Sequence, residues 1–189
     1  MAKVVIISGS ATVKSRLDGV LERIETKVRE ADLDVQTIKV RDLPPEALIY
    51  GQFDHPAVVE ANQLLEESTA VIIASPIYKA SYTGVLKTFL DLIPQKGLEG
   101  KVVLPIAIGG TISHLLAIDH SFKPVLSALG AYLILQGVFV QDTQVERSED
   151  GYKLDADIVP RLTSAAETFI REVQLRNTQA QPSIGIVSV

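Results

Sequence analysis

Short apolar runs alternate with amphipathic stretches along most of the chain. The runs are continuous and rich in β-branched residues, as expected of parallel strands that are buried on both faces. We predict buried strands at Lys3–Ser8, Ala70–Ser75 and Lys101–Gly109, a more exposed strand at Asp34–Val40, and a further strand at Tyr132–Val140. Pro76 directly follows the second buried strand, and we expect that strand to stop there because proline cannot donate to a ladder.

Between the apolar runs, hydrophobic residues recur at the spacing of a helix with one buried face. The predicted helices cover Arg16–Ala31, Pro56–Ser68, Thr83–Leu92, Leu115–Leu129 and Asp155–Gln174. Strands that alternate with helices of this length are joined by right-handed crossovers in a parallel sheet. We therefore predict an α/β fold of three layers, with helices on both faces of a doubly wound, five-stranded parallel sheet.

The length of 189 residues suits a single domain, which we assign to residues 1–176. Residues 177–189 are predicted to form a C-terminal tail with a late apolar stretch, "IGIVSV". This tail either frays or docks on a neighbouring subunit. The slightly positive mean hydropathy also points to an oligomer.

Composition excludes several classes of function. The chain has no cysteine, which rules out disulfides, thiolate catalysis and cysteine-ligated metals and fits a reducing cytoplasm. A formal net charge of −5 argues against sequence-independent nucleic-acid binding. No apolar stretch approaches the ~20 residues of a membrane span, and the first apolar run is too short for a good signal peptide. We therefore expect a cytoplasmic protein without nucleic-acid or membrane partners.

In a doubly wound sheet, ligands bind beyond the carboxyl ends of the strands, where the strand order reverses. The loop after the first strand is rich in hydroxyls and opens a helix, whose free N–H groups and dipole suit an anion. The candidate ligands of a phosphate in this loop are Ser8, Ser10, Thr12, Ser15 and Arg16. Neither a G-x-G-x-x-G nor a Walker pattern is present, so a terminal monophosphate fits better than a bridging one. The alternative is an ordinary cluster of N-capping serines.

The loop after the second buried strand carries features of a site for a planar ligand. Beyond Pro76, the main chain of Ile77 and Tyr78 is expected to be free of a ladder and able to contact a polar ligand edge. Tyr78 and Tyr82 offer ring faces for stacking, and Lys79 offers a cation. The alternative is that the tyrosines pack at the surface and that Pro76 marks only a helix entry.

The loop after the third buried strand contains Gly109, Gly110 and Thr111. Two glycines permit positive φ and close approach of the main chain, and the threonine adds donors for the same ligand, although such a pair is often only a turn. His114 either contacts the ligand or caps a helix. The histidines lack a metal-ligand spacing and no G-x-S-x-G is present, so neither a metal site nor a catalytic triad is expected.

Three stretches resemble a known family: "SPIYKASYTGVLKTFLDLIP", "GKVVLPIAIGGTISHLLAIDHSFKPVLSALGA" and "GVFVQD". They are similar to the flavodoxin-like NAD(P)H-dependent FMN reductases, and in particular to the FMN reductase component of bacterial alkanesulfonate monooxygenase systems. The resemblance runs from the first strand to about Asp142 and implies the strand order 2-1-3-4-5. It places the FMN phosphate in the loop Ser8–Arg16, the flavin ring over Pro76–Lys79, and its polar edge at Gly109–Thr111.

The resemblance also implies a function. NADPH or NADH would stack on the exposed face of the flavin and pass it a hydride, so no protein side chain is expected to be essential for the chemistry. Reduced FMN would then leave for a partner monooxygenase that cleaves carbon–sulfur bonds, and the protein would be a homodimer or homotetramer. Three alternatives stay open: a quinone, azo or chromate reductase with FMN as a prosthetic group, a flavodoxin-like electron carrier, and a flavin-free interaction module.

Two positions depart from the family pattern. The usual first loop is similar to G-S-P-R-x-x-S, whereas Ala11–Thr12 stand here in place of the Pro-Arg pair, so a guanidinium is missing. Alkanesulfonate-type members can carry a tyrosine at the place of His120, in a widened turn at a tetramer interface. Pro124 cannot donate to the carbonyl four residues earlier, which a π-type bulge or a plain kink would absorb. An interfacial His120 would couple assembly to pH.

Overall fold

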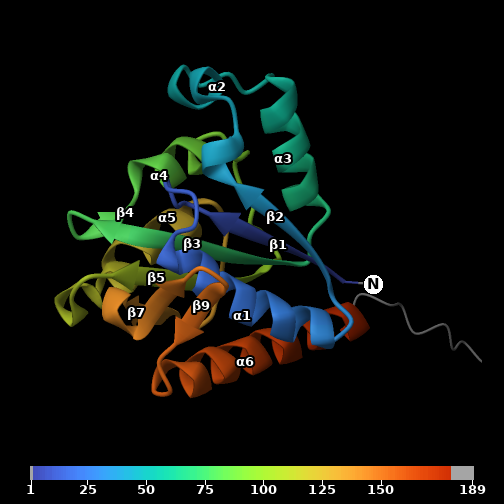
Figure 1. Cartoon of the computed structure of the whole chain (residues 1–189). Coiled ribbons are helices and arrows are strands. Elements are labelled where there is room, and N and C mark those ends of the chain that lie inside the picture. The colour runs from blue at the N-terminus through green and yellow to red at the C-terminus, as the bar shows by residue number, and fades with distance from the viewer. Residues whose placement is uncertain (1, 180–189) are drawn as a thin grey trace, which may run out of the picture.

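The computed structural model describes residues 2–179. A parallel sheet forms its central layer (Figure 1), in the order β2, β1, β3, β5 and then the pair β6 and β7. The strands are β1 (Lys3–Ser8), β2 (Asp34–Lys39), β3 (Ala70–Tyr78), β5 (Val102–Gly109), β6 (Leu133–Ile134) and β7 (Val138–Gln141). The predicted doubly wound fold and its strand order are confirmed, with the fifth strand in two pieces.

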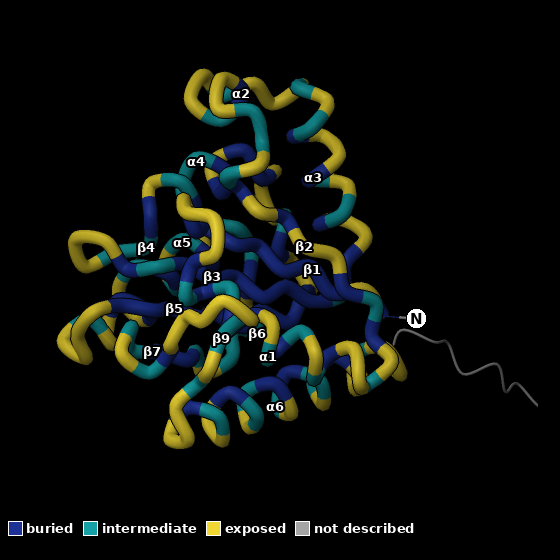
Figure 2. Tube along the Cα trace, in the orientation of Figure 1, coloured by how far each residue is buried: buried dark blue, intermediate teal, exposed yellow. Residues whose placement is uncertain are grey.

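Helices cover both faces of the sheet (Figure 1). One face carries α1 (Arg16–Glu30) and α6 (Ile158–Gln179), and the other carries α2 (Pro45–Ile49), α3 (Pro56–Glu66), α4 (Gly84–Leu90) and α5 (Lys123–Ala128). Alternate residues of each strand supply two separate cores: Val4 and Ile6 pack with α1 and α6, whereas Val5 and Ile7 pack with the helices opposite. Figure 2 shows β1, β3, β5 and β7 buried along most of their length, as the continuous apolar runs predict, whereas β2 is more exposed.

The strand β3 does not stop at Ser75, and that prediction is wrong. It continues through Pro76 to Tyr78, then turns into the short antiparallel strand β4 (Ser81–Tyr82). The carbonyl of Ala74 accepts the N–H of Gly9 (2.8 Å), just beyond the last residue of β1. Two residues further, Pro76 faces the same side, where β1 no longer runs, so its missing N–H leaves no ladder bond unmade.

The predicted strand Tyr132–Val140 is interrupted because of a proline in its neighbour. Leu135 donates its N–H to the carbonyl of Val103 (2.8 Å), and pairing resumes only at Val138, opposite Ile106. Pro105 lies between these two points on β5 and has no N–H to offer. The chain therefore leaves the ladder between β6 and β7.

The helix predicted over Leu115–Leu129 is also divided. A 3-10 turn covers Ile112–His114, a π turn covers Ile118–Phe122, and α5 follows. Of the two alternatives for Pro124, the structure shows the π turn. The widened turn lies directly before α5, in which Pro124 takes a position in the first turn that needs no N–H.

A hairpin that was not predicted from the sequence covers the N-terminal part of α1. Its strands are β8 (Val145–Ser148) and β9 (Gly151–Leu154). A Cβ added at Gly19 of α1 would lie 2.5 Å from Cβ of Tyr152, so only glycine lets the hairpin pack this closely. The last helix, α6, extends to Gln179 and so includes the first residues of the predicted tail, while positions 180–189 lie outside the described residues. No helix within residues 2–179 is both long and apolar enough to span a membrane.

Candidate functional site

Three loops meet at the carboxyl edge of the sheet, as the order of the strands requires. The N–H of Gly9 bonds to Ala74 of β3, and Pro76 pairs with Ile108 of β5. The ends of β3, β5 and β7 lie on the same side, at the left in Figure 1. We call residues 9–15, 76–80 and 109–114 the three-loop site.

The first loop, residues 9–15, ends at the N-cap of α1. The Asp18 carboxylate accepts the N–H of Ser15 (2.8 Å), so the side chain three residues into the helix caps the main chain. The hydroxyl of Ser15 does not return this bond: it is buried, in a residue that is 8% exposed, and has no partner among the described residues. The hydroxyl of Ser8 is likewise buried and lacks a partner within the described chain.

The other predicted phosphate ligands bond within the protein. Ser10 donates to the carbonyl of Thr12 (3.3 Å) and accepts its N–H (3.4 Å), which curls the loop. Arg16 directs its Nε to the carbonyl of Val145 on β8 (2.9 Å). One donor of Arg16 therefore ties α1 to the hairpin rather than pointing into the loop.

A buried pair of hydroxyls, which the sequence analysis missed, locks the first loop to the second. Thr83 donates its hydroxyl to the carbonyl of Gly9 (2.6 Å) and accepts the N–H of Leu86 (3.0 Å) as the N-cap of α4. Ser75 accepts the N–H of Thr83 (3.0 Å) and donates to the carbonyl of Pro76 (2.8 Å). The signal for this role was present, because a threonine directly before a helical pattern is a typical N-cap.

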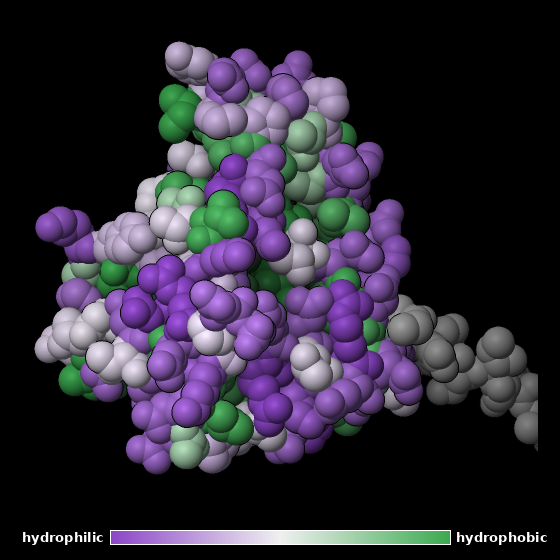
Figure 3. Space-filling view, viewed as in Figure 1, coloured by the Kyte–Doolittle hydropathy of each residue, from purple (hydrophilic) through white to green (hydrophobic). Residues whose placement is uncertain are grey.

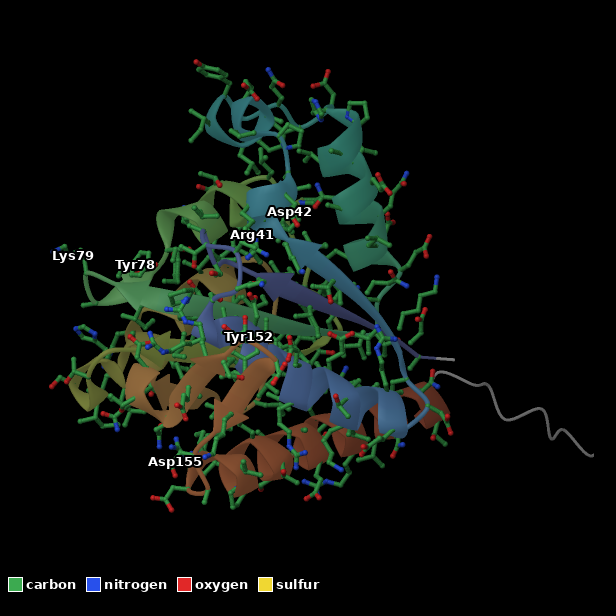
Figure 4. All side chains as sticks on the ribbon, in the orientation of Figure 1. Arg41, Asp42, Tyr78, Lys79, Tyr152 and Asp155 are labelled. Atoms are coloured by element: carbon green, nitrogen blue, oxygen red, sulfur yellow. The ribbon has the colours of Figure 1, made fainter. Side chains whose placement is uncertain are left out.

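The second loop is the tip of the β3–β4 hairpin. The main chain of Ile77 and Tyr78 was expected to be free, but these residues pair with Tyr82 and Ser81. Ile77 is buried, and Pro76 is half-buried at the edge. Tyr78 is 53% exposed, and Figure 4 shows it with Lys79 near the tip of the hairpin, with Lys79 furthest from the body of the molecule.

The ring of Tyr82 is a packing residue. It meets Phe122 of the π turn edge-to-face, with ring centroids 5.2 Å apart and planes at 83°. Burial raises the pKa of the Tyr82 phenol above its ordinary value. For this tyrosine the packing alternative therefore holds, and Tyr78 is the exposed ring at the site.

In the third loop, close packing explains glycine at one of the two positions, and backbone conformation explains neither. Neither has a positive φ. A Cβ at Gly109 would lie 3.2 Å from the ring of Phe139, so close packing favours glycine there, while Gly110 is exposed. Thr111 is exposed and accepts the N–H of Ser113 (3.3 Å). The Nδ1 atom of His114 is buried and has no partner in residues 2–179, so it does not cap a helix.

The hydrogen-bond donors of the first loop that lack a protein partner among the described residues suit a monophosphate. The unpartnered Ser15 hydroxyl lies at the positive end of α1, a helix of 15 residues. In the described part of the chain, the N–H groups of Ala11, Val13 and Lys14 also make no hydrogen bond. Unpartnered N–H and hydroxyl groups at a helix N-terminus are the donors that suit an anion, and at the neighbouring edge Pro76 is half-buried while Gly110 and Thr111 are exposed.

Comparison with known proteins decides the family. The profile of the family described as NADPH-dependent FMN reductase matches residues 2–146. The chain belongs to this family. An FMN reductase (NADPH) from Escherichia coli is 42% identical over 177 residues, which cover 94% of this reductase and 93% of the relative. An FMN reductase (NADPH) from Pseudomonas putida is 42% identical over 184 residues, which cover 96% and 93%.

A solved structure agrees with this assignment. The apo form of an NADH:FMN oxidoreductase, EMOB, superimposes with a TM-score of 0.83 at 35% identity and covers 91% of this reductase and 90% of that chain. The protein is therefore an oxidoreductase of flavodoxin-like fold that uses FMN together with NADPH or NADH. The resemblance drawn from the sequence motifs is confirmed at this level.

Proposed function

We propose that this reductase delivers reduced FMN to a separate monooxygenase that cleaves the carbon–sulfur bond of an alkanesulfonate. The observation that supports the delivery of reduced FMN is the openness of the three-loop site. Most residues of the site are exposed, namely Ala11–Lys14, Tyr78–Ala80 and Gly110–Ser113. A flavin bound on such an open surface exchanges with solvent and behaves as a substrate. The sulfonate partner is supported by the resemblance of the sequence motifs.

We assign the FMN-binding role residue by residue. Ser8, Ser10, Thr12 and Ser15 surround the phosphate, with the unpartnered Ser15 hydroxyl as its principal side-chain donor. Arg16, whose Nε bonds to the carbonyl of Val145, contributes positive charge at the end of the loop. The ring lies over Pro76–Lys79, and Gly109–Thr111 contact its polar edge. Homodimeric or homotetrameric assembly and a cytoplasmic location belong to the same proposal.

The protein contributes placement rather than proton transfer. FMN, when bound, would supply the hydride acceptor for the nicotinamide, and no protein acid would be needed at the reacting carbon. Main-chain N–H groups around Thr111 would favour the negative charge that develops on the flavin ring. Substitutions in the three-loop site are therefore expected to weaken flavin binding in a graded way instead of abolishing turnover.

Steady-state NADPH oxidation with FMN, FAD and riboflavin in parallel tests the reductase half. The purified protein should be colourless, and its rate should rise hyperbolically with free FMN. A stoichiometrically bound flavin, with a rate that follows added quinone or azo dye instead of FMN, would establish the prosthetic-group alternative. A bound flavin without NADPH oxidation would establish an electron carrier.

A coupled assay tests whether the reduced FMN serves an alkanesulfonate monooxygenase. With an alkanesulfonate monooxygenase, oxygen and an alkanesulfonate, sulfite release should require both proteins and stop when either is left out. If FMN is reduced at an undiminished rate and no sulfite forms, the sulfonate role is wrong although the reductase assignment stands.

A further inference from the structure

The side chain of Arg41 bonds to the first loop from a distant part of the sequence. Arg41 lies in a 3-10 turn, Val40–Asp42, directly after β2. Its Nη1 donates to the carbonyl of Thr12 at 2.6 Å, and its side chain is only 12% exposed. Figure 4 shows it at the end of β2. A guanidinium therefore lies against position 12, although position 12 itself carries a threonine.

The positive charge of Arg41 is only weakly compensated by carboxylates within residues 2–179. Its Nε is buried and lacks a hydrogen-bond partner among the residues described. The nearest carboxylate, that of Asp42, lies 3.5 Å from Nε and is itself 65% exposed, where solvent weakens the attraction.

A cleft of about 530 Å³ beside the first loop contains both signs of charge. The face that carries α1 and the β8–β9 hairpin is mostly hydrophilic there (Figure 3). Its basic residues are Lys14, Lys39, Arg41 and Arg147, and its acidic residues are Asp18, Glu22, Glu149 and Asp150. Among the basic residues, only Arg41 and Arg147 donate to the main chain of the first loop (2.6 and 3.3 Å) within residues 2–179.

These two arginines orient the peptides of the loop. Their hydrogen bonds hold the carbonyls of Thr12 and Lys14 on the side of the loop that faces the two arginines. In a planar trans peptide the C=O and N–H groups point in opposite directions, so the N–H of Val13 is turned away from Arg41. A phosphate binds to N–H groups and is repelled by carbonyl oxygens, so this orientation presents the loop correctly to an anion.

We propose that Arg41 is a positioning residue for the flavin phosphate and sets the preference of this reductase for FMN over riboflavin. It supplies from β2 the guanidinium that the loop itself lacks, fixes the peptide after Thr12, and adds positive charge beneath the loop. This inference rests on the proposed placement of the FMN phosphate in residues 9–15.

The test compares flavins with and without the phosphate. Arg41→Gln should raise the KM for FMN about tenfold, as expected for the loss of a charged hydrogen bond, while the KM for riboflavin stays within about twofold. Lys39→Gln is the matched control, because it removes a cation of the same cleft that makes no hydrogen bond to the loop among the described residues, and both KM values should stay within about twofold. Adding Thr12→Arg to Arg41→Gln should return the KM for FMN to within about threefold of the unmodified reductase.

Equal increases for FMN and riboflavin would overturn the proposal in favour of a purely structural role, and so would an unchanged KM for FMN. Thermal melting identifies a variant that does not fold. In that case Arg41→Lys, which keeps the charge but not the planar fork, should raise the KM for FMN alone by about threefold. If the unmodified reductase has the same KM for both flavins, the phosphate does not bind in this loop, and the proposed site fails independently of Arg41.

Discussion

Serine hydroxyls at the strand ends differ in what they bond to. Ser75 is satisfied by Thr83 and by the carbonyl of Pro76, whereas Ser8 and Ser15 have no partner in the described residues. A buried hydroxyl without a partner costs free energy in the folded protein, and a ligand that accepts its hydrogen bond recovers that cost. The sequence presents all three as serines after or near a buried strand, so only the contacts distinguish structural from binding residues.

Ser15→Ala should separate capping from binding. Because the Ser15 hydroxyl makes no hydrogen bond within residues 2–179, its loss should cost less than the ~1 kcal/mol of a typical capping serine. The KM for FMN should rise several-fold. Ser75→Ala is the control for stability, and it should lower the free energy of unfolding by about 1–3 kcal/mol because the N–H of Thr83 loses its acceptor. Equal destabilisation by the two variants in urea titrations would contradict this assignment.

The buried side chain of Lys101 lies against the C-terminal end of α3 and bonds to carbonyls there. Lys101 donates from Nζ to the carbonyls of Ser68 (2.6 Å) and Glu66 (3.1 Å). Lys101→Met should destabilise the protein by about 1–3 kcal/mol at neutral pH, because these carbonyls lose their donor. FMN reduction should be unaffected, since Lys101 lies at the opposite end of β5 from the three-loop site. A loss of activity at full stability would show that the lysine has another role.

The same residue predicts a dependence of stability on pH. Burial lowers the pKa of Lys101 below its ordinary value of 10.5. Between the folded and unfolded pKa values the unfolded chain binds more protons, so the free energy of unfolding rises with pH in that window. The difference in stability between the unmodified protein and Lys101→Met should therefore widen as pH is raised toward 10.5. A narrowing difference in urea titrations would show that this lysine is stabilised in its charged form.

At the scale of elements, strand ends depend on what runs beside them. Pro76 lies inside β3 because β1 has ended, and Pro105 divides the neighbouring strand because no N–H is present to pair. The β3–β4 hairpin closes over Lys79 and Ala80, with φ values of 52° and 64°. Side chains other than glycine and asparagine are strained in this left-handed region.

Ala80→Gly should relieve this strain and raise the free energy of unfolding by about 1 kcal/mol. Ala165→Gly is the opposite control, because Ala165 lies within α6, where glycine costs about 0.5–1 kcal/mol. Thermal and urea unfolding of the two variants should shift in opposite directions. If Ala80→Gly destabilises as Ala165→Gly does, the hairpin tip does not limit stability.

At the scale of the molecule, exposed apolar side chains occur within the three-loop site and directly after it. They are Tyr78 on the hairpin and Ile112, Leu115 and Leu116 after β5. The hairpin contacts the neighbouring π turn, where Ser121 donates to the carbonyl of Ala80 (3.4 Å). Exposed apolar side chains that lie together in this way are typical of an interface, which agrees with the proposed homo-oligomer.

Leu116→Glu should therefore reduce the mass measured by light scattering at micromolar concentration, because Leu116 is 57% exposed in this group. Leu175→Glu is the matched control: Leu175 is 52% exposed on α6, away from the carboxyl edge, and the mass should not change. An unchanged mass for both variants would place the interface elsewhere, and a monomeric unmodified protein would remove the oligomer from the proposal.

The sequence by itself determined the layers of the fold and the resemblance to the family, and it predicted the edge of the sheet at which we propose that FMN binds. Continuous apolar runs and helical periodicity report burial at each position, and burial is a local property that a linear pattern records. Only the tertiary structure decided where β3 ends, that the fifth strand is divided, that a hairpin crosses α1 at Gly19, and that Arg41 meets Thr12. Each of these depends on a partner far away in the sequence, because a hydrogen bond or a close approach is a property of two segments and neither segment encodes it alone.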